Sequence, residues 1–359
     1  MGGDWISVGY AVGNVVSSVT LVLLNKKVFA GGFAFPMTLS FFHFLFTIAW
    51  YQMLYCCGAF TKPAADMPQT EKFKVALAGF ASIGFMNLSL NHNSVGFYQI
   101  TKLTIIPCTL IINAFQGVHA SGKVKLSLCI LLAGVGVATV TDVELRPIGF
   151  LFGALAVVST AVFQIWQGTK QKEWGISATQ LQSGISVWQS AQALAVSLAV
   201  ECYCLGPAPC AGTTAIDFFQ TAMGAGADAA AKQHTLALVL LTCFIALAVN
   251  LCSFGLIGRT SPITFQVVGH AKTCLVLVGG YVLFPAKVHD QQKLINNIAG
   301  VSVAMVGVIL YGNIKHAGGR NEPDCLDCVC PGAVLTCIEP DYAKVNPSET
   351  EGLKSSEEK

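Results

Sequence analysis

Two lysines lie inside stretches of sequence that are otherwise almost entirely apolar. Lys102 lies about six residues into the stretch at 96–116, and Lys272 lies about ten residues into the stretch at 262–284. At a rise of about 1.5 Å per residue, these positions are roughly 9 and 15 Å deep in a membrane-spanning helix. Insertion of a lysine at such depth costs at least ~2.5 kcal/mol. Lys102 could reach the interface by extending its side chain, whereas Lys272 has farther to reach.

The residues around the two lysines carry rings, amides and hydroxyls. Tyr98 is four residues before Lys102 and shares its helix face, with Gln99 next to it. In the second stretch the polar neighbours of Lys272 are Gln266, His270 and Thr273. These groups beside a cation suit a ligand that has a ring, hydroxyls and phosphates. His270 alone is more typical of a structural hydrogen-bonding residue.

The apolar stretches offer these lysines almost no carboxylate. Glu201 is at the end of the stretch at 178–203, where a position at the membrane interface would explain it. Asp142 and Glu144 follow another stretch and are expected in a solvated turn. The sequence therefore predicts that an anionic ligand compensates the two positive charges.

Composition places the whole chain in a membrane. Of its 359 residues, 53% are hydrophobic and 11% are charged, and the mean hydropathy is +0.62. Soluble domains carry about 25% charged residues. The net charge of +2 gives no reason to expect a nucleic-acid partner. The expected surroundings are a lipid bilayer.

The hydropathy pattern predicts an all-α integral membrane protein with ten transmembrane helices. A span of about 20 residues crosses the hydrocarbon core. The predicted spans are 5–24, 36–58, 73–91, 96–116, 124–141, 148–168, 178–203, 235–257, 262–284 and 292–314. The connection at 206–234 is expected to be a loose loop. The acidic, aperiodic segment 317–359 reads as a disordered cytosolic tail, and its part from about Glu322 is expected to be dispensable for transport.

Lysine and arginine favour a cytosolic location of both termini. If both termini are cytosolic, ten lysines and arginines fall in the connections and ends on the cytosolic side and six on the opposite side, as the positive-inside rule expects. The ten are Lys62, Lys72, Lys74, Lys123, Lys125, Lys170, Lys172, Arg259, Lys315 and Arg320.

The chain contains an internal repeat. The pattern S-x-x-x-aromatic-Q at 94–99 recurs at 261–266, and "AGVGVATV" at 133–140 matches "AGVSVAMV" at 299–306 at six of eight positions. The repeat predicts two five-helix halves, 1–145 and 146–316. An odd number of spans per half inverts the second half, which is a signature of alternating-access transporters. Small residues in the repeated segment favour close helix packing.

No pattern of a catalytic or metal site is apparent. The spans contain no HExxH, no aspartate pair and no GxSxG. The tail holds Cys325, Cys328, Cys330 and Cys337, but no histidine accompanies them, so acylated or plain thiols are favoured over a zinc site. We therefore expect neither an enzyme nor a metal or other cofactor. A scaffold protein without transport would need no buried lysine.

Several longer motifs resemble one family of carriers. "LNKKVF", "GFAFPMTLSFFH", "NLSLNHNSVGFYQITKLTIIP", "GVGVATVTDVEL" and "TSPITFQVVGHAKTCLVLVGGYVLF" resemble the nucleotide-sugar and triose-phosphate translocators of the drug/metabolite transporter superfamily. The resemblance covers about residues 5–315. The pair Lys272-Thr273 is similar to the Lys-Thr group of nucleotide-sugar carriers, and the chain looks most similar to plant-type UDP-sugar transporters.

The resemblance implies roles for particular residues. Lys102 and Lys272 would hold the phosphates, with Thr273 beside them. Side chains that would line the site are Tyr98, Gln99, Gln266 and His270. Asn25 and Lys26, at the end of the first span, would act near the lumenal gate, although Lys27 could replace Lys26 in that role.

The resemblance also implies a function and a location. The expected protein is a Golgi antiporter that exchanges cytosolic UDP-sugar, such as UDP-xylose or UDP-galactose, for lumenal UMP. The alternatives are a triose-phosphate or other phosphometabolite exchanger, and a location in the endoplasmic reticulum membrane. A homodimer is a candidate assembly. The sequence does not name the sugar.

Overall fold

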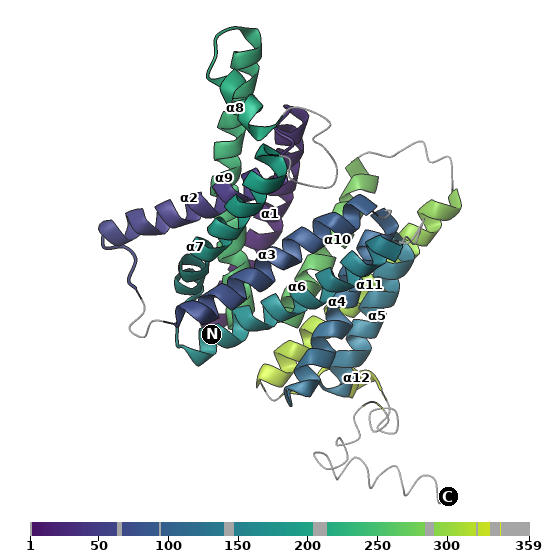
Figure 1. The fold of residues 1–359 in the computed structure, drawn as a ribbon. Helices are drawn as coiled ribbons and strands as arrows, with labels where there is room; N and C mark the ends of the chain where they lie inside the picture. The colour runs from purple at the N-terminus through teal and green to yellow at the C-terminus, as the bar shows by residue number, and fades with distance from the viewer. Residues whose placement is uncertain are drawn as a thin grey trace, which may run out of the picture. The chain divides into compact units, whose positions relative to one another are not determined.

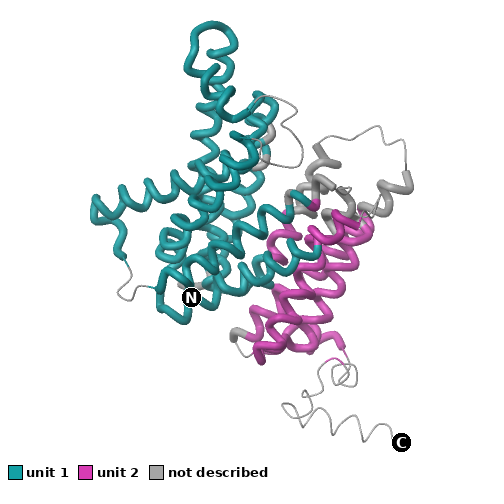
Figure 2. The backbone as a smooth tube through the Cα atoms, viewed as in Figure 1, with its two compact units in different colours: residues 1–88, 154–265 teal, residues 89–153, 266–359 magenta. Residues whose placement is uncertain are grey.

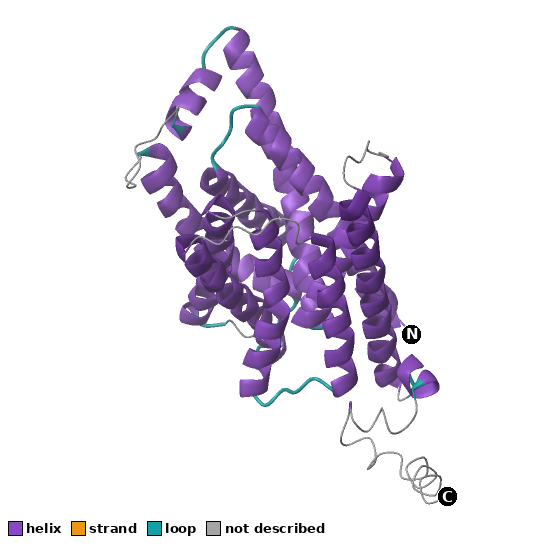
Figure 3. Ribbon diagram, turned by 90° about the vertical axis from the view of Figure 1, so that its right-hand side faces the viewer, coloured by secondary structure: helices purple, strands orange, loops and turns teal. Residues whose placement is uncertain are grey.

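The structure is a computed structural model that describes residues 2–62, 67–92, 95–139, 147–203, 214–283, 291–320, 322–330 and 338. These residues form helices joined by turns and short loops, and none of them forms a strand (Figure 3). They divide into two compact units (Figure 2). Unit 1 comprises residues 1–88 and 154–265, and unit 2 comprises residues 89–153 and 266–359.

Helices lie over all ten predicted ranges (Figure 1). Their bounds are α1 Gly2–Ala30, α2 Pro36–Cys56, α3 Gln69–His92, α4 Val95–Phe115, α5 Gly122–Thr139, α6 Pro147–Glu173, α7 Ala178–Val196, α9 Ala227–Arg259, α10 Pro262–Leu283 and α11 Gln291–Arg320. A π-helical turn, Ser197–Cys202, continues α7. The short helices are α8, Ala215–Ala222, and α12, Cys325–Val329.

Length and hydropathy alone qualify five described segments as membrane spans. They are Trp5–Ala30, Pro36–Cys56, Pro147–Glu173, Ala227–Arg259 and Ile298–Gly318. The all-α membrane class is thereby confirmed. The ten-span topology and the inverted repeat stay predictions.

The connection expected to be a loose loop contains helix α8 and the first turns of α9. Thr214 and Asp217 form a capping box, in which the Thr214 hydroxyl accepts from the Asp217 N–H and the Asp217 carboxylate accepts from the Thr214 N–H. Phe218 of α8 packs edge-on against Phe33, with ring centroids 5.1 Å apart. Capping and an aromatic cluster therefore order part of a segment whose composition reads as a loop.

Glu201 is buried within unit 1. Its carboxylate accepts hydrogen bonds from the backbone N–H groups of Met37 and Thr38, at 2.8 and 2.7 Å. Phe35, the residue that precedes α2, has no side chain that could cap the helix. Glu201 therefore serves as the cap of α2 from a distant part of unit 1, since the first N–H groups of a helix have no partner within it.

In unit 2 the two copies of the repeated segment pack against each other. A Cβ added at Gly134 of α5 would overlap the backbone of Ala304 and the carbonyl of Gly300 in α11. A Cβ at Gly307 would lie 2.7 Å from the Cα of Leu131. The predicted role of these small residues in close helix packing is confirmed for this pair of helices.

Ordered structure continues beyond residue 317, where the sequence predicts that a disordered tail begins. α11 runs to Arg320, and α12 follows after a short connection. Lys123, at the start of α5, donates to Asp324 at 3.0 Å and forms a second ion pair with Asp327. The N–H of Cys325 donates to the Asn313 side chain at 2.8 Å. The beginning of the tail is thus tied to α5 and α11 by charge and hydrogen bonds.

Candidate functional site

The two lysines singled out by the sequence belong to the same unit. Lys102 is on α4 and Lys272 is on α10, and both side chains are partly buried. Their positive charges interact with each other, and each also interacts with His270. Like charges repel, and a bound anion would reduce the repulsion between these two lysines. The chemistry that this arrangement supports is therefore the binding of a negatively charged group.

Helix α10 places Gln266 and His270 one turn apart, and both are buried. His270 is 7% exposed, and its Nε2 atom has no hydrogen-bond partner among the described residues. A buried nitrogen without a partner loses its hydration free energy, which a ligand can restore. A Cβ added at Gly269 would meet no described atom within 4 Å, so this part of α10 borders open space.

Helix α4 contains a proline five residues after Lys102. Pro107 has no N–H to donate to the carbonyl of Leu103, the residue next to Lys102. The helix hydrogen-bond ladder is therefore interrupted beside the lysine. Such interruptions in membrane helices are typical of positions where other groups satisfy the backbone.

The other predicted site residues are less fully described. Tyr98 and Gln99 lie in the first turns of α4, Thr273 follows Lys272 in α10, and Lys26 lies in α1, but all four side chains fall outside the described part of the structure. Asn25 belongs to unit 1. Its Oδ1 atom is buried and accepts no hydrogen bond from any described residue.

Unit 1 contains a polar cavity that sequence reasoning missed. It has a volume of about 180 Å³ and is lined by amides and hydroxyls, together with Phe44, Phe163, Phe254 and Phe265. The polar lining residues are Thr47, Ser82, Thr160, Gln164, Gln167, Gln182, Ser186, Gln189, Asn250 and Ser253. None of the described residues that line it is acidic or basic. It can therefore bind neutral hydroxyls and heterocyclic amides.

The walls of this cavity are partly fixed by their own hydrogen bonds. Ser82 and Thr160 are 2.6 Å apart, and Asn14 donates to Ser253 at 2.8 Å. The Nε2 atom of Gln182 has no partner among the described residues. A signal in the sequence was the glutamine spacing at 164, 167 and 171, which places three amides on one face of an otherwise apolar helix.

Metal-ligating side chains do not gather in the described part of the chain. No group of three or more His, Cys, Asp or Glu side chains there could hold an ion. Cys325, Cys328 and Cys330 are free thiols on or beside α12, and Cys337 lies outside the described residues.

Comparison with known proteins gives matches over most of the chain. The model of the Triose-phosphate Transporter family matches residues 9–312. UDP-xylose transporter 1 of Arabidopsis thaliana is 38% identical over 86% of this chain and 84% of its own length. UDP-xylose transporter 2 of the same plant is 40% identical over 83% of this chain and 78% of its own length. UDP-rhamnose/UDP-galactose transporter 1, also from Arabidopsis thaliana, is 33% identical over 83% of this chain and 80% of its own length.

Proposed function

The chain belongs to the triose-phosphate transporter family and is a membrane transporter, not an enzyme, and on that premise we propose that it exchanges a UDP-sugar for UMP. The observation that carries the proposal is the pair of mutually repelling lysines beside buried His270 in unit 2. A diphosphate neutralises such a pair, whereas a free sugar does not. The names of the relatives support a UDP-sugar over other phosphates.

Each site residue has a role in this proposal. Lys102 and Lys272 bind the phosphates, and the free Nε2 of His270 makes a hydrogen bond to the same ligand. Gln266, Thr273, Tyr98 and Gln99 line the site. Asn25 and Lys26 act at the lumenal gate, and the buried, unpartnered Oδ1 of Asn25 is available for a gate contact.

Alternating access follows from the inverted repeat that we propose for 1–145 and 146–316, with 317–359 outside the repeat. Two findings support it. The repeated segments of α5 and α11 pack against each other in unit 2. Each unit also takes corresponding helices from both halves: α1 to α3 with α6, α7 and α9, and α4 and α5 with α10 and α11. Such pairing is expected of two copies related by a pseudo-two-fold axis.

Strict exchange follows from the repulsion between the two lysines. A bound phosphate reduces the repulsion between Lys102 and Lys272, and we propose that the protein changes between its two facing states mainly with such a ligand bound. UDP-sugar and UMP both carry phosphate, so either one allows this change. We therefore expect the empty protein to change only slowly between its cytosol-facing and lumen-facing states. The Golgi membrane is the proposed location, on the similarity to UDP-sugar transporters, and a homodimer remains a prediction.

The test is transport by purified protein in proteoliposomes. Vesicles preloaded with UMP should take up UDP-xylose or UDP-galactose rapidly, and empty vesicles should take up little. External UMP should compete, whereas free xylose should not. Equal uptake by empty and loaded vesicles would reject exchange. Faster uptake of triose phosphate than of any UDP-sugar would establish the alternative, a phosphometabolite exchanger.

A further inference from the structure

The tail helix α12 carries a group of thiols that the proposed transport site does not use. Cys325 and Cys328 lie on α12, and Cys330 follows its last residue. All three are free thiols; Cys328 is exposed and the other two are half-buried. Although Asp324 and Asp327 stand beside them, no group of three or more His, Cys, Asp or Glu side chains in the described part of the chain could hold a metal ion. The thiols of α12 are therefore not gathered as metal ligands.

A hydrogen bond to α11 sets the level at which α12 begins. The backbone N–H of Cys325 donates to the side chain of Asn313 at 2.8 Å. Asn313 belongs to the segment Ile298–Gly318, which qualifies as a membrane span. It precedes the end of that segment by five residues, which is about 7.5 Å along a helix. The chain has therefore turned back, and α12 begins level with the last turns of the span, where the membrane meets water.

The start of α5 holds α12 from another side. Lys123, the second residue of α5, donates to Asp324 at 3.0 Å and forms a second ion pair with Asp327. Lys315 of α11 is exposed and lines the same cavity as Lys123 and Asp324. The lysine distribution predicts that these helix ends face the cytosol, where lysines beside a membrane helix attract anionic lipid head groups. α12 is thus fixed to two helix ends on the predicted cytosolic side.

Cys328 is the thiol of this group that is best placed to react. Its neighbour Val329 is apolar and 79% exposed, so this end of α12 is open. Burial and the nearby Asp324 carboxylate raise the pKa of Cys325, which leaves less of its thiolate at neutral pH. The thiolate is the nucleophilic form of cysteine. Exposure therefore favours Cys328, and burial disfavours Cys325.

We propose that α12 is a site of S-acylation and that Cys328 is the first residue to be modified. Its thiolate attacks the carbonyl carbon of a long-chain acyl-CoA. A thioester bond forms, the bond from the acyl group to the sulfur of coenzyme A breaks, and coenzyme A leaves as a thiol that carries the proton lost by Cys328. Since α12 lies where the membrane meets water, the acyl chain can enter the bilayer and anchor the tail. Cysteines next to a membrane span are typical sites of this reversible modification.

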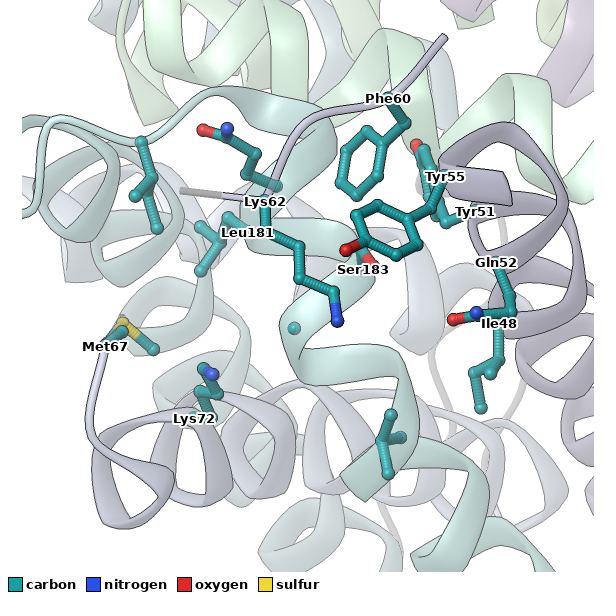
Figure 4. A pocket seen from close by; sticks show the side chains of 14 residues that line it. Ile48, Tyr51, Gln52, Tyr55, Phe60, Lys62, Met67, Lys72, Leu181 and Ser183 are labelled. Carbon is teal, nitrogen blue, oxygen red and sulfur yellow. The ribbon is translucent and has the colours of Figure 1, made fainter. Parts of the chain in front are cut away.

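The proposal rests on the predicted cytosolic location of this end and not on the transported substrate. Unit 1 supplies a second pair of exposed thiols, Cys56 and Cys57, where α2 ends. The chain that follows them carries Phe60 and Lys62 to the wall of another cavity, with a volume of about 380 Å³ (Figure 4). Neither cysteine lines that cavity, so Cys56→Ser/Cys57→Ser removes both thiols without changing its lining. This double variant is the parent protein for the test.

The test is acyl–polyethylene-glycol exchange on the full-length protein, made in a eukaryotic host that contains acyltransferases. Hydroxylamine cleaves thioesters, and each thiol that it frees then gains a fixed mass. The parent protein should show a hydroxylamine-dependent mass shift, and adding Cys328→Ser should remove it. Cys129 is the matched control, because it is an exposed thiol of the same unit that lies within α5. Cys129→Ser should leave the shift unchanged.

A further variant separates the position of the thiol from an effect on folding. Val329→Cys, added to Cys328→Ser, moves the exposed thiol by one residue and should restore the shift. A parent protein without any hydroxylamine-dependent shift would overturn the proposal, and so would a shift that persists in Cys328→Ser. One zinc ion per chain that is lost with Cys328→Ser would also overturn it, because a thiol that ligates a metal is not available to form a thioester.

Discussion

The lysines of unit 2 have two different kinds of electrostatic surroundings. Lys123, at the start of α5, is 7% exposed and lies between two carboxylates of the tail, Asp324 and Asp327. Lys102 and Lys272 lie on helices whose sequences contain no acidic residue, and their charges interact with each other and with His270. The charge of Lys123 is compensated by two carboxylates, whereas Lys102 and Lys272 repel each other.

The difference separates a structural cation from cations that suit a ligand. Burial alone lowers the pKa of Lys123, but the hydrogen bonds to Asp327 and Asp324 more than offset this, and the pKa is raised. Lys123 therefore stays charged as part of the fold. Lys102 and Lys272, by contrast, repel each other, and a bound anion would reduce that repulsion. Retention of such a pair is expected where the substrate supplies the compensating charge.

The largest effect is expected at Lys272. Lys272→Ala should lower exchange of the best UDP-sugar about 10- to 100-fold or more, because hydrogen bonds to a charged group contribute about 1.5–3 kcal/mol. Protein abundance and melting temperature should stay near normal or rise, since one member of a repelling pair is removed. Exchange in proteoliposomes and thermal unfolding are the two measurements.

The matched variant is Lys123→Ala, which removes the structural cation. It should lower the melting temperature while leaving the exchange rate of the folded protein near normal. The comparison fails if Lys272→Ala melts lower than Lys123→Ala, or if Lys272→Ala still exchanges at the wild-type rate.

The comparison also shows which features the sequence could reveal. Hydropathy placed a helix at each predicted range, and depth in the apolar stretches identified Lys102 and Lys272. The partners of Lys123 could not be found in this way, because 201 residues separate it from Asp324. The same holds for Glu201, which caps α2 across 163 residues. Pairings of this kind are set by tertiary packing.

Local signals for the short helices were nevertheless present. Thr214 and Asp217, and Asp324 and Asp327, each have the i, i+3 spacing of a capping box. Composition dominated the interpretation of both segments, since alanine, glycine and acidic residues usually indicate a loop or a tail. A search for caps would have predicted α8 and α12.

A medium effect is expected when the carboxylates around Lys123 are neutralised. Asp324→Asn/Asp327→Asn leaves a buried ammonium without its two ion pairs, and should destabilise the protein by about 2–4 kcal/mol. Thermal unfolding of the purified protein measures the loss. Adding Lys123→Met should recover most of it, because the uncompensated charge is then gone. Failure of Lys123→Met to restore stability would show that the ion pairs are not the cause.

Tail truncations sharpen this result. Truncation after Gly319 removes Asp324 and Asp327 and should lower the melting temperature, whereas truncation after Ala343 keeps α12 and should not. The sequence predicts that the shorter protein keeps its exchange activity, and assay of both truncations below their melting temperatures tests that prediction. Equal melting of the two truncations would deny α12 a structural role.

The smallest effect is expected at Glu71, whose ion pairs lie near the surface before the predicted span at 73–91. Glu71 accepts from Lys74 of its own helix and contacts Lys170 of α6 at 3.0 Å, and these hydrogen bonds lower its pKa. A lowered pKa means that the stabilisation is present above the ordinary glutamate value and is lost as the pH falls through the lowered one. Glu71→Gln should therefore melt slightly below wild type at neutral pH and equally at acidic pH, with high salt reducing the difference. Melting curves across this pH range provide the measurement. A difference that persists in acid would attribute the effect to packing and not to charge.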